Sequence, residues 1–184
     1  SENTDELTNK LVGLTQASKF GANDLRLLAS QGGSVSKLGV SLDDFLVTSA
    51  LVAESFGSGS DAGTSFKTFV GALTNDSKPA REAIEELGLE FFDSTGSLKD
   101  FVDIVDELNT SFSGLSEEDA NRFSKAIFGQ DASRFALDLA ATSRQEFLST
   151  QAQVFSADAA KQAAINAEAT QTSLETLGDV NQSA

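Results

Sequence analysis

A serine followed three residues later by an aspartate or a glutamate recurs along this chain, ahead of residues with apolar side chains at helical spacing. Such a serine hydroxyl accepts a hydrogen bond from the backbone N–H three residues on, and the acid favours the positive end of the helix dipole. The chain also has a single proline, so little forces it out of helix. These pairs predict helix starts at Ser41, Ser97, Ser116 and Ser143.

Apolar residues at three- and four-residue spacing predict helices along most of the chain. Pro79, two residues after Ser77, is typical of a first helical turn, and Gly88 is typical of a helix end. The predicted helical segments are 7–20, 25–38 (one or two helices, interrupted or kinked near Gly32-Gly33), 42–56, 62–73, 80–87, 98–112, 117–128, 131–139 and a last one from 143. We therefore expect an all-α fold, a compact multi-helix domain followed by a long C-terminal helix.

One stretch breaks the helical pattern. Residues 89–92 are short, apolar and aromatic, and Asp93-Ser94-Thr95-Gly96 is a turn sequence. We expect a short β-hairpin or an extended loop near 89–98.

The composition changes along the chain and suggests three parts. Residues 1–21 predict an N-terminal helix leading into the core, residues 22–142 a helical domain, and residues 143–184 an Ala-rich helical tail. Because the sequence starts with Ser1 and has no signal-peptide pattern, we expect a piece of a longer protein.

Small residues in the tail recur at alternating spacings of three and four. Either this seam packs on its own domain or it pairs with other copies in a coiled coil, and the sequence favours neither. The residues of this candidate oligomer seam are Ala160, Ala163, Ala167, Leu174 and Leu177.

The amino acids that are missing exclude several kinds of site. Without cysteine or histidine there is no disulfide, zinc-thiolate site, imidazole ligand or Ser-His-Asp triad, and we expect no cofactor and no metal. The net charge of −15 argues against stable binding to nucleic acid, which is driven by clustered Lys and Arg. No apolar run approaches the roughly 18–20 residues of a membrane span.

Four patterns approach known catalytic or ligand-binding motifs, and none is convincing. Residues 57–63 resemble a dinucleotide loop with its third glycine one position late, between two helices and not after a strand. Ser34-x-x-Lys37 is a chance match, and the turn at Asp93 lacks the acidic positions of a calcium loop. Acid pairs such as Glu85-Glu86 are ordinary on solvated helices. We expect no enzyme.

About six short motifs follow one another between residues 22 and 142. They span 37–44, 58–64, 79–89, 92–98, 115–118 and 127–129. In this order they resemble the signature of phage tail tape measure proteins of the TP901 core family. The match fades after Leu139. The positions that carry the resemblance are Gly39, Val40, Ser41, Leu42, Ala62, Gly63, Leu87, Gly88, Phe92, Asp93, Gly96, Phe128 and Gly129.

The resemblance implies a structural role in a virion. Tape measure proteins lie inside the tail tube, assemble as a few copies such as a trimer, contact tail tube and tail tip proteins, and set tail length. The implied location is the tail, with the host cytoplasm as the place of assembly. The motif residues are of the types expected at helix ends, helix caps and close helix contacts. We therefore interpret the family signature as one that specifies the fold and not a catalytic site. The alternative is a non-catalytic helical adaptor or binding module unrelated to tails.

Overall fold

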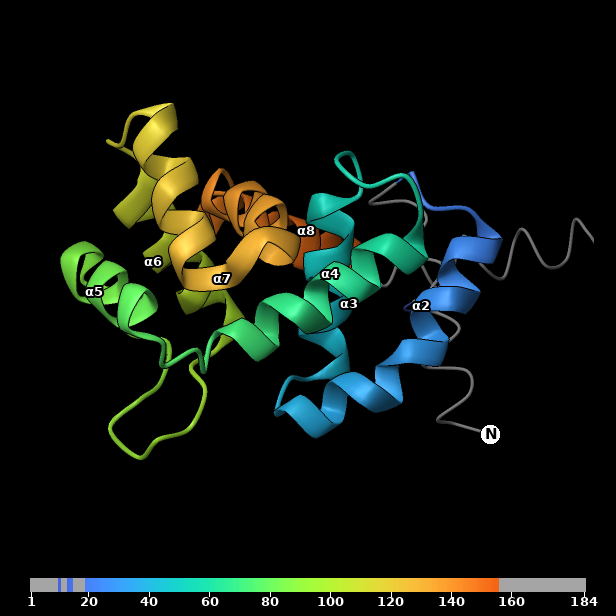
Figure 1. Cartoon of the computed structure of the whole chain (residues 1–184). Coiled ribbons are helices and arrows are strands. Elements are labelled where there is room, and N and C mark those ends of the chain that lie inside the picture. Colours follow the sequence, from blue (N-terminus) through green and yellow to red (C-terminus); the bar gives the residue numbers. More distant parts are fainter. Residues whose placement is uncertain (1–9, 11–12, 15–18, 156–184) are drawn as a thin grey trace, which may run out of the picture.

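The computed structural model describes residues 10, 13–14 and 19–155, and this part of the chain is helical (Figure 1). Its elements are α2 (Ala22–Val35), the 3-10 turn η1 (Ser36–Leu38), α3 (Leu42–Val52), α4 (Gly59–Ala72), α5 (Lys78–Leu87), α6 (Phe101–Phe112), α7 (Glu117–Ala140) and α8 (Arg144–Val154). No strand forms among the described residues, which confirms the all-α prediction. No described helix is both long and apolar enough to span a bilayer.

Serine caps start most of these helices, as the sequence predicts. The Ser41 hydroxyl accepts a hydrogen bond from the Asp44 N–H (3.0 Å), and Ser116 and Ser143 cap α7 and α8 in the same way. Ser77 caps α5, with Pro79 in the first turn. Ser58, which the sequence analysis did not single out, caps α4.

The predicted cap at Ser97 is wrong, because the backbone of Ser97 belongs to a turn. Its N–H donates to the Asp93 carboxylate (3.0 Å) and its carbonyl accepts from the Asp93 N–H (2.8 Å). Helix α6 therefore starts three residues later, with Asp100 at the N-cap.

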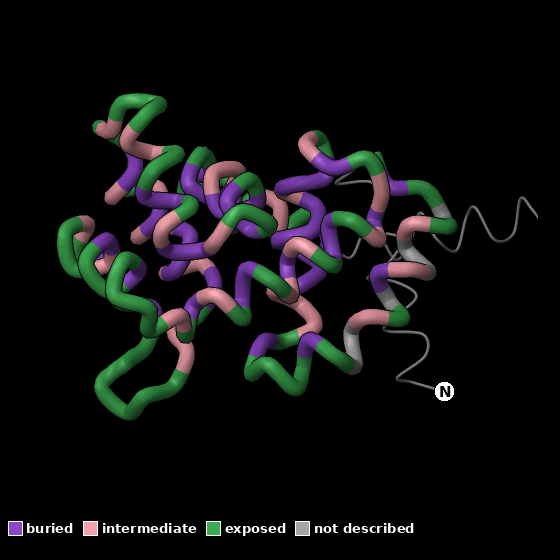
Figure 2. The backbone as a smooth tube through the Cα atoms, viewed as in Figure 1, coloured by how far each residue is buried: buried purple, intermediate pink, exposed green. Residues whose placement is uncertain are grey.

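The hairpin predicted at 89–98 does not form either. The two arms share only an isolated antiparallel bridge between Phe92 and Leu98. Pairing stops beyond this bridge, where the Glu90 N–H donates to the Glu107 carboxylate on α6 and not to the opposite arm. The segment is an extended loop, and its tip from Asp93 to Ser97 is exposed (Figure 2).

Helices α4 and α7 form the centre of the fold. α7 packs against α4, α5 and α6, while α2 covers another side of α4. α8 packs against α3 and α6, so residues 144–154 contribute to the same body and bury Phe147 and Val154. The long C-terminal helix expected from residue 143 is not supported, because α8 ends at Val154; the seam predicted at 160–177 lies outside the described residues.

Phenylalanine rings fill the core. Phe66 lies 5.0 Å from Phe45, 5.4 Å from Phe101 and 5.8 Å from Phe135, measured between ring centroids. Phe69 stacks on Phe128 at 5.0 Å. These contacts join α3, α4, α6 and α7 through one connected set of rings. Aromatic pairs that pack edge to face or offset stabilise a fold by more than the burial of their surface alone.

Helix α7 breaks at Gly129, where φ is 76° and ψ is 175°. The first half buries Phe123 and Ile127, and the second half buries Phe135 and Leu139. On one straight helix these two faces would differ by roughly a third of a turn. The break therefore lets both halves face the same core.

The break expected in the helix at 25–38 is absent. α2 runs without interruption through Gly32 and Gly33 to Val35, and only then tightens into η1, which ends at Gly39 with φ 79°. Continuous i to i−4 hydrogen bonding tolerates glycine at a cost of about 1 kcal/mol per residue, and packing of α2 against α4 offsets that cost.

Candidate functional site

The loop between α5 and α6 is a preorganised turn built on Asp93. Its carboxylate accepts hydrogen bonds from the Thr95 hydroxyl (2.6 Å), the Thr95 N–H (2.8 Å) and the Ser97 N–H. These bonds, the Thr95 hydroxyl first, hold the pKa of Asp93 below its usual range. Gly96 supplies the positive φ of 82° that closes the turn.

Alternating burial orients the first arm of this loop. Leu89 and Phe91 are buried, and the Phe91 ring lies 6.0 Å from Phe128. Glu90 is exposed and 37% of Phe92 remains accessible. The arm is thus anchored on α7 and presents Glu90 and Phe92 outward.

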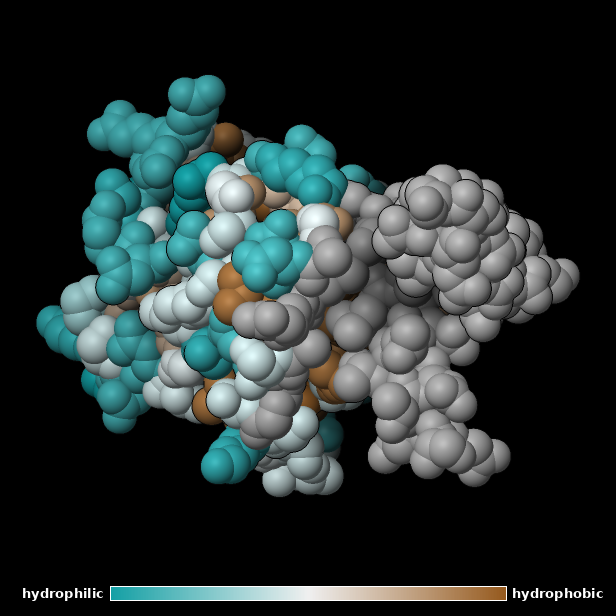
Figure 3. All heavy atoms as spheres, turned by 90° about the vertical axis from the view of Figure 1, so that its right-hand side faces the viewer, coloured by the Kyte–Doolittle hydropathy of each residue, from teal (hydrophilic) through white to brown (hydrophobic). Residues whose placement is uncertain are grey.

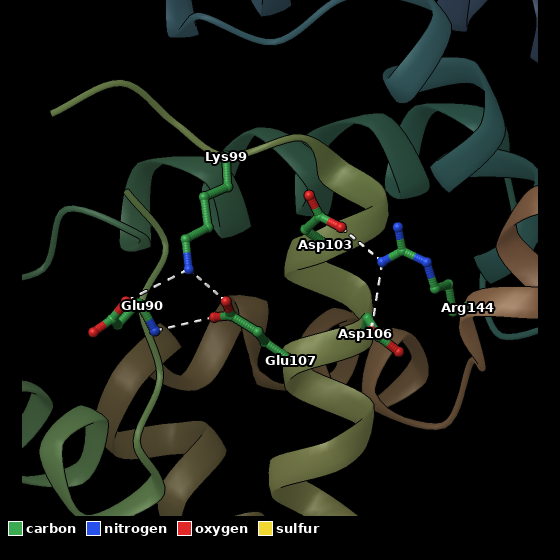
Figure 4. Close-up of polar contacts among 6 residues, drawn as sticks. All are labelled: Glu90, Lys99, Asp103, Asp106, Glu107 and Arg144. Atoms are coloured by element: carbon green, nitrogen blue, oxygen red, sulfur yellow. Dashed lines mark hydrogen bonds and ion pairs between the residues drawn. The ribbon is translucent and has the colours of Figure 1, made fainter. Parts of the chain in front are cut away.

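Lys99 ties the loop to α6 (Figure 4). Its ammonium lies 2.5 Å from the Glu107 carboxylate and 3.7 Å from that of Glu90. The hydrogen bond with Glu107 is the main cause that raises the pKa of Lys99. Because the Glu90 N–H also donates to Glu107, one α6 carboxylate holds both arms of the loop.

Arg144 makes a second clamp on the same helix. Its guanidinium donates to Asp103 at 2.6 Å and contacts Asp106 at 3.5 Å (Figure 4). The hydrogen bond with Asp103 raises the pKa of Arg144. α6 therefore carries acidic side chains that are paired with cations from the preceding loop and from the start of α8.

The motif residues that carry the family resemblance lie in several separate segments. Gly39, Gly88, Gly96 and Gly129 all have positive φ, which L side chains rarely adopt. Phe128 packs on Phe69, whereas Asp93 lies in the exposed loop. These residues are not brought together into a pocket.

The remaining motif positions lie at helix starts and contacts. Val40 and Ala62 are buried, while Leu42 and Leu87 are half-buried beside the core. A Cβ at Gly63 would lie 2.8 Å from the Gln31 amide oxygen, at the end of a flexible side chain of α2 that packs over this glycine of α4. The amino acid found at each of these positions is accounted for by its role in packing or in a helix end.

Sequence reasoning missed Asp24, which joins α2 and α4. Its carboxylate accepts hydrogen bonds from the Gly59 N–H (2.8 Å) and the Gly21 N–H (3.1 Å). A Cβ at Gly59 would lie 2.7 Å from the Asp24 carbonyl oxygen. One carboxylate thus serves the N-terminal ends of two helices. The glycine-rich pattern at residues 57–63 was the only local sign that this segment is unusual. It did not indicate that Asp24 contacts Gly59.

Two carboxyl groups of the described residues have a raised pKa, and they lie on different helices, α3 and α7. Burial is the main cause that raises the pKa of Asp44 and of Asp138, and both are half-buried. Two shallow hollows, of about 330 Å³ and 440 Å³, have neither residue in their linings. Ser34 and Lys37 are both exposed at the end of α2 and in η1.

The described surface offers no cation site and no broad apolar patch. No group of three or more acidic side chains among the described residues could hold a metal ion. The large apolar side chains left exposed there are Leu38, Phe92 and Leu148, each on a different element. On the face in Figure 3, apolar residues of the described part form small spots between hydrophilic and neutral ones.

Comparison with known proteins places the chain among phage tail proteins. A family model described as "Phage-related minor tail protein" matches residues 1–129. A curated relative, the "Tape measure protein" of Pneumococcus phage Dp-1, is 30% identical over 98 residues, which are 52% of this chain and 8% of that protein. No solved structure matches the chain. The TP901 core subfamily stays a prediction. With a family model matched from residue 1 to residue 129, the chain belongs to the phage-related minor tail protein family.

Proposed function

We propose that this chain is a folded helical section of a tape measure protein, whose parent chain sets tail length during assembly. The observation that carries the proposal is the 30% identity over 98 residues to a protein that bears this name. The motif residues lie in separate segments, at helix ends and packing contacts, which supports a structural role. Because the chain aligns with only 8% of that relative, the ruler itself would lie mostly outside these residues.

In this proposal the chain lies within the tail tube or at the tail tip. Its partners are tail tube and tail tip proteins, and it assembles in the host cytoplasm as a few copies, such as a trimer, before it becomes part of the virion. A net charge of −15 supports a place beside DNA without binding it, because like charges repel. The alternative adaptor unrelated to tails has no observation in its favour now that the family is known.

In-frame shortening of the parent gene outside this domain tests the ruler role. Tail lengths are measured by electron microscopy for a series of deletions. We expect tails to shorten by about 1.5 Å per deleted residue, the rise of an α-helix. Synonymous recoding of the same stretch is the control and should leave length unchanged. Tails of normal length in every deletion would show that the parent is not the ruler.

A further inference from the structure

The segments by which the chain enters and leaves the described fold lie against each other. Gly13 lies against the backbone of Val154, where a Cβ would collide with the Val154 carbonyl oxygen. The Lys10 ammonium lies 5.5 Å from the centre of the Phe155 ring. The start and the end of the described body therefore meet at one place, although about 140 residues separate them in sequence.

Lys10 links this junction to the start of α3. Its ammonium lies 2.8 Å from the Asp43 carboxylate, and its side chain is only 21% exposed. A cation over an aromatic face is attracted by the ring, more strongly when it is partly removed from water. One lysine thus contacts the first turn of α3 and the residue that follows α8.

We propose that this junction, which we call the Lys10 latch (Lys10, Gly13, Asp43, Val154 and Phe155), makes the domain nearly length-neutral in the tail. This inference rests on the proposed ruler role. A continuous helix over the same stretch would add about 220 Å at 1.5 Å per residue. With its two ends latched together, the folded body adds only the distance between them. Tail length is then set by the parts of the parent protein outside residues 10–155. The folded domain adds little to the length of the extended protein.

A tandem duplication of residues 10–155 in the parent gene tests length neutrality. We expect tails of unchanged length by electron microscopy. The matched control duplicates an equally long stretch of the parent outside this domain, and should lengthen tails by about 220 Å. Lengthening by the same amount in both would overturn the latch inference and leave the ruler role intact. Unchanged length in both would instead contradict the ruler role.

A cross-linking experiment on this 184-residue chain tests the latch without tails. The chain has no cysteine, so Lys10→Cys with Phe155→Cys gives two unique thiols. The contact between the Gly13 and Val154 backbones remains in this variant and keeps the two positions close, so a short thiol cross-linker should join them within one molecule. The control pair is Lys10→Cys with Gln145→Cys, whose second thiol lies at the other end of α8, about 15 Å further along that helix. Equal cross-linking of both pairs, or none at position 155, would overturn the inference whether or not duplicated genes yield tails.

A single substitution tests the part that Lys10 plays. Lys10→Gln should speed amide hydrogen exchange several-fold in the last turn of α8, because the contacts with Asp43 and Phe155 are lost. Lys19→Gln is the control, since Lys19 pairs with Glu54 at 3.8 Å on the exposed surface. If both variants exchange alike in that turn, Lys10 does not hold the latch.

Discussion

Single residues decide where the helices of this domain break and end. Gly129 has φ 76° and ψ 175°, a region that is essentially restricted to glycine. The break that it allows is held by side chains: the buried Ser124 hydroxyl donates to the Ser133 carbonyl (2.8 Å), and the Asn75 amide donates to the Ile127 carbonyl (2.9 Å). The Asn75 amide thereby satisfies the Ile127 carbonyl, one of the backbone groups that the break frees.

Gly129→Ala should therefore destabilise the fold by about 1–3 kcal/mol, the cost of a strained backbone. Gly71→Ala is the matched control, because Gly71 is exposed in α4 with open space around it. We expect that control to stabilise the fold by about 0.5–1 kcal/mol, the helix preference for Ala over Gly. Urea unfolding measures both. Equal effects of the two substitutions would contradict the strained geometry at Gly129.

Two carboxyl groups should change stability with pH in opposite directions. Burial raises the pKa of Asp138 above 3.8, so its ionisation costs stability as pH rises through the folded pKa. Asp138→Asn should gain stability over the native chain at pH 7 but not at pH 3.5.

The turn lowers the pKa of Asp93, so the Asp93 carboxylate stabilises the fold above pH 3.8, and this stabilisation is lost as the pH falls through the folded pKa. Asp93→Asn should lose stability at pH 7.

Denaturant unfolding at the two pH values checks both variants. The opposite signs make the pair its own control. A gain from Asp93→Asn at pH 7, or a loss from Asp138→Asn there, would contradict the environments described for these carboxylates.

At the scale of elements, the helices are held by a shared aromatic core and by long-range caps. Phe66 on α4 contacts rings from α3, α6 and α7, so no helix of this set packs independently of α4. The Asn109 amide on α6 donates to the Ala140 carbonyl at the end of α7 (2.8 Å). The charged clamps at Lys99 and Arg144 add to this at the surface of α6.

Phe66→Ala should cost about 3–5 kcal/mol, the range for large core truncations. Small domains have only about 5–15 kcal/mol in total, so this variant should be barely folded. Phe92→Ala is the control on an exposed ring and should cost under about 1 kcal/mol. Thermal unfolding followed by circular dichroism compares them. A Phe66 variant as stable as the Phe92 variant would show that the ring cluster is not the core.

Local rules predicted the elements well and the contacts between them poorly. The caps at Ser41, Ser116 and Ser143 depend on three residues of sequence, and so they could be predicted. The prediction of a helix cap at Ser97 was wrong because the turn at Asp93 uses the backbone groups of Ser97. The partner of Asp24 lies 35 residues away, and no local pattern indicates such a pairing.

In the candidate site, too, the local structure could be predicted from sequence and the long-range contacts could not. The turn residues Asp93 and Gly96 stood out in sequence because turn chemistry is local. The clamps that hold this turn could not be predicted, since charged residues are common on every helix of this chain and only the fold selects Glu107 for Lys99. The Lys10 latch is still less visible, because it joins the two ends of the described body.

At the scale of the whole molecule, residues 10–155, as far as they are described, form a helical body whose first and last described segments meet, and the full chain has a net charge of −15. That shape is unlike an extended ruler, and it agrees with the proposal that the chain is a folded section of a tape measure protein. The family match supports a tail component, while position and copy number are proposals. A copy number in assembled tails tests the account as a whole.

The most direct measurement counts this chain in purified tails by mass spectrometry. Trypsin should release residues 82–99, between Arg81 and Lys99, as one peptide that contains the Asp93 turn. An isotope-labelled standard of that peptide gives copies per tail, and tail tube peptides give the reference. We predict a small fixed number of copies per tail, far below the tube subunits. Absence of the peptide from tails of normal length, or a number equal to that of the tube subunits, would contradict the account.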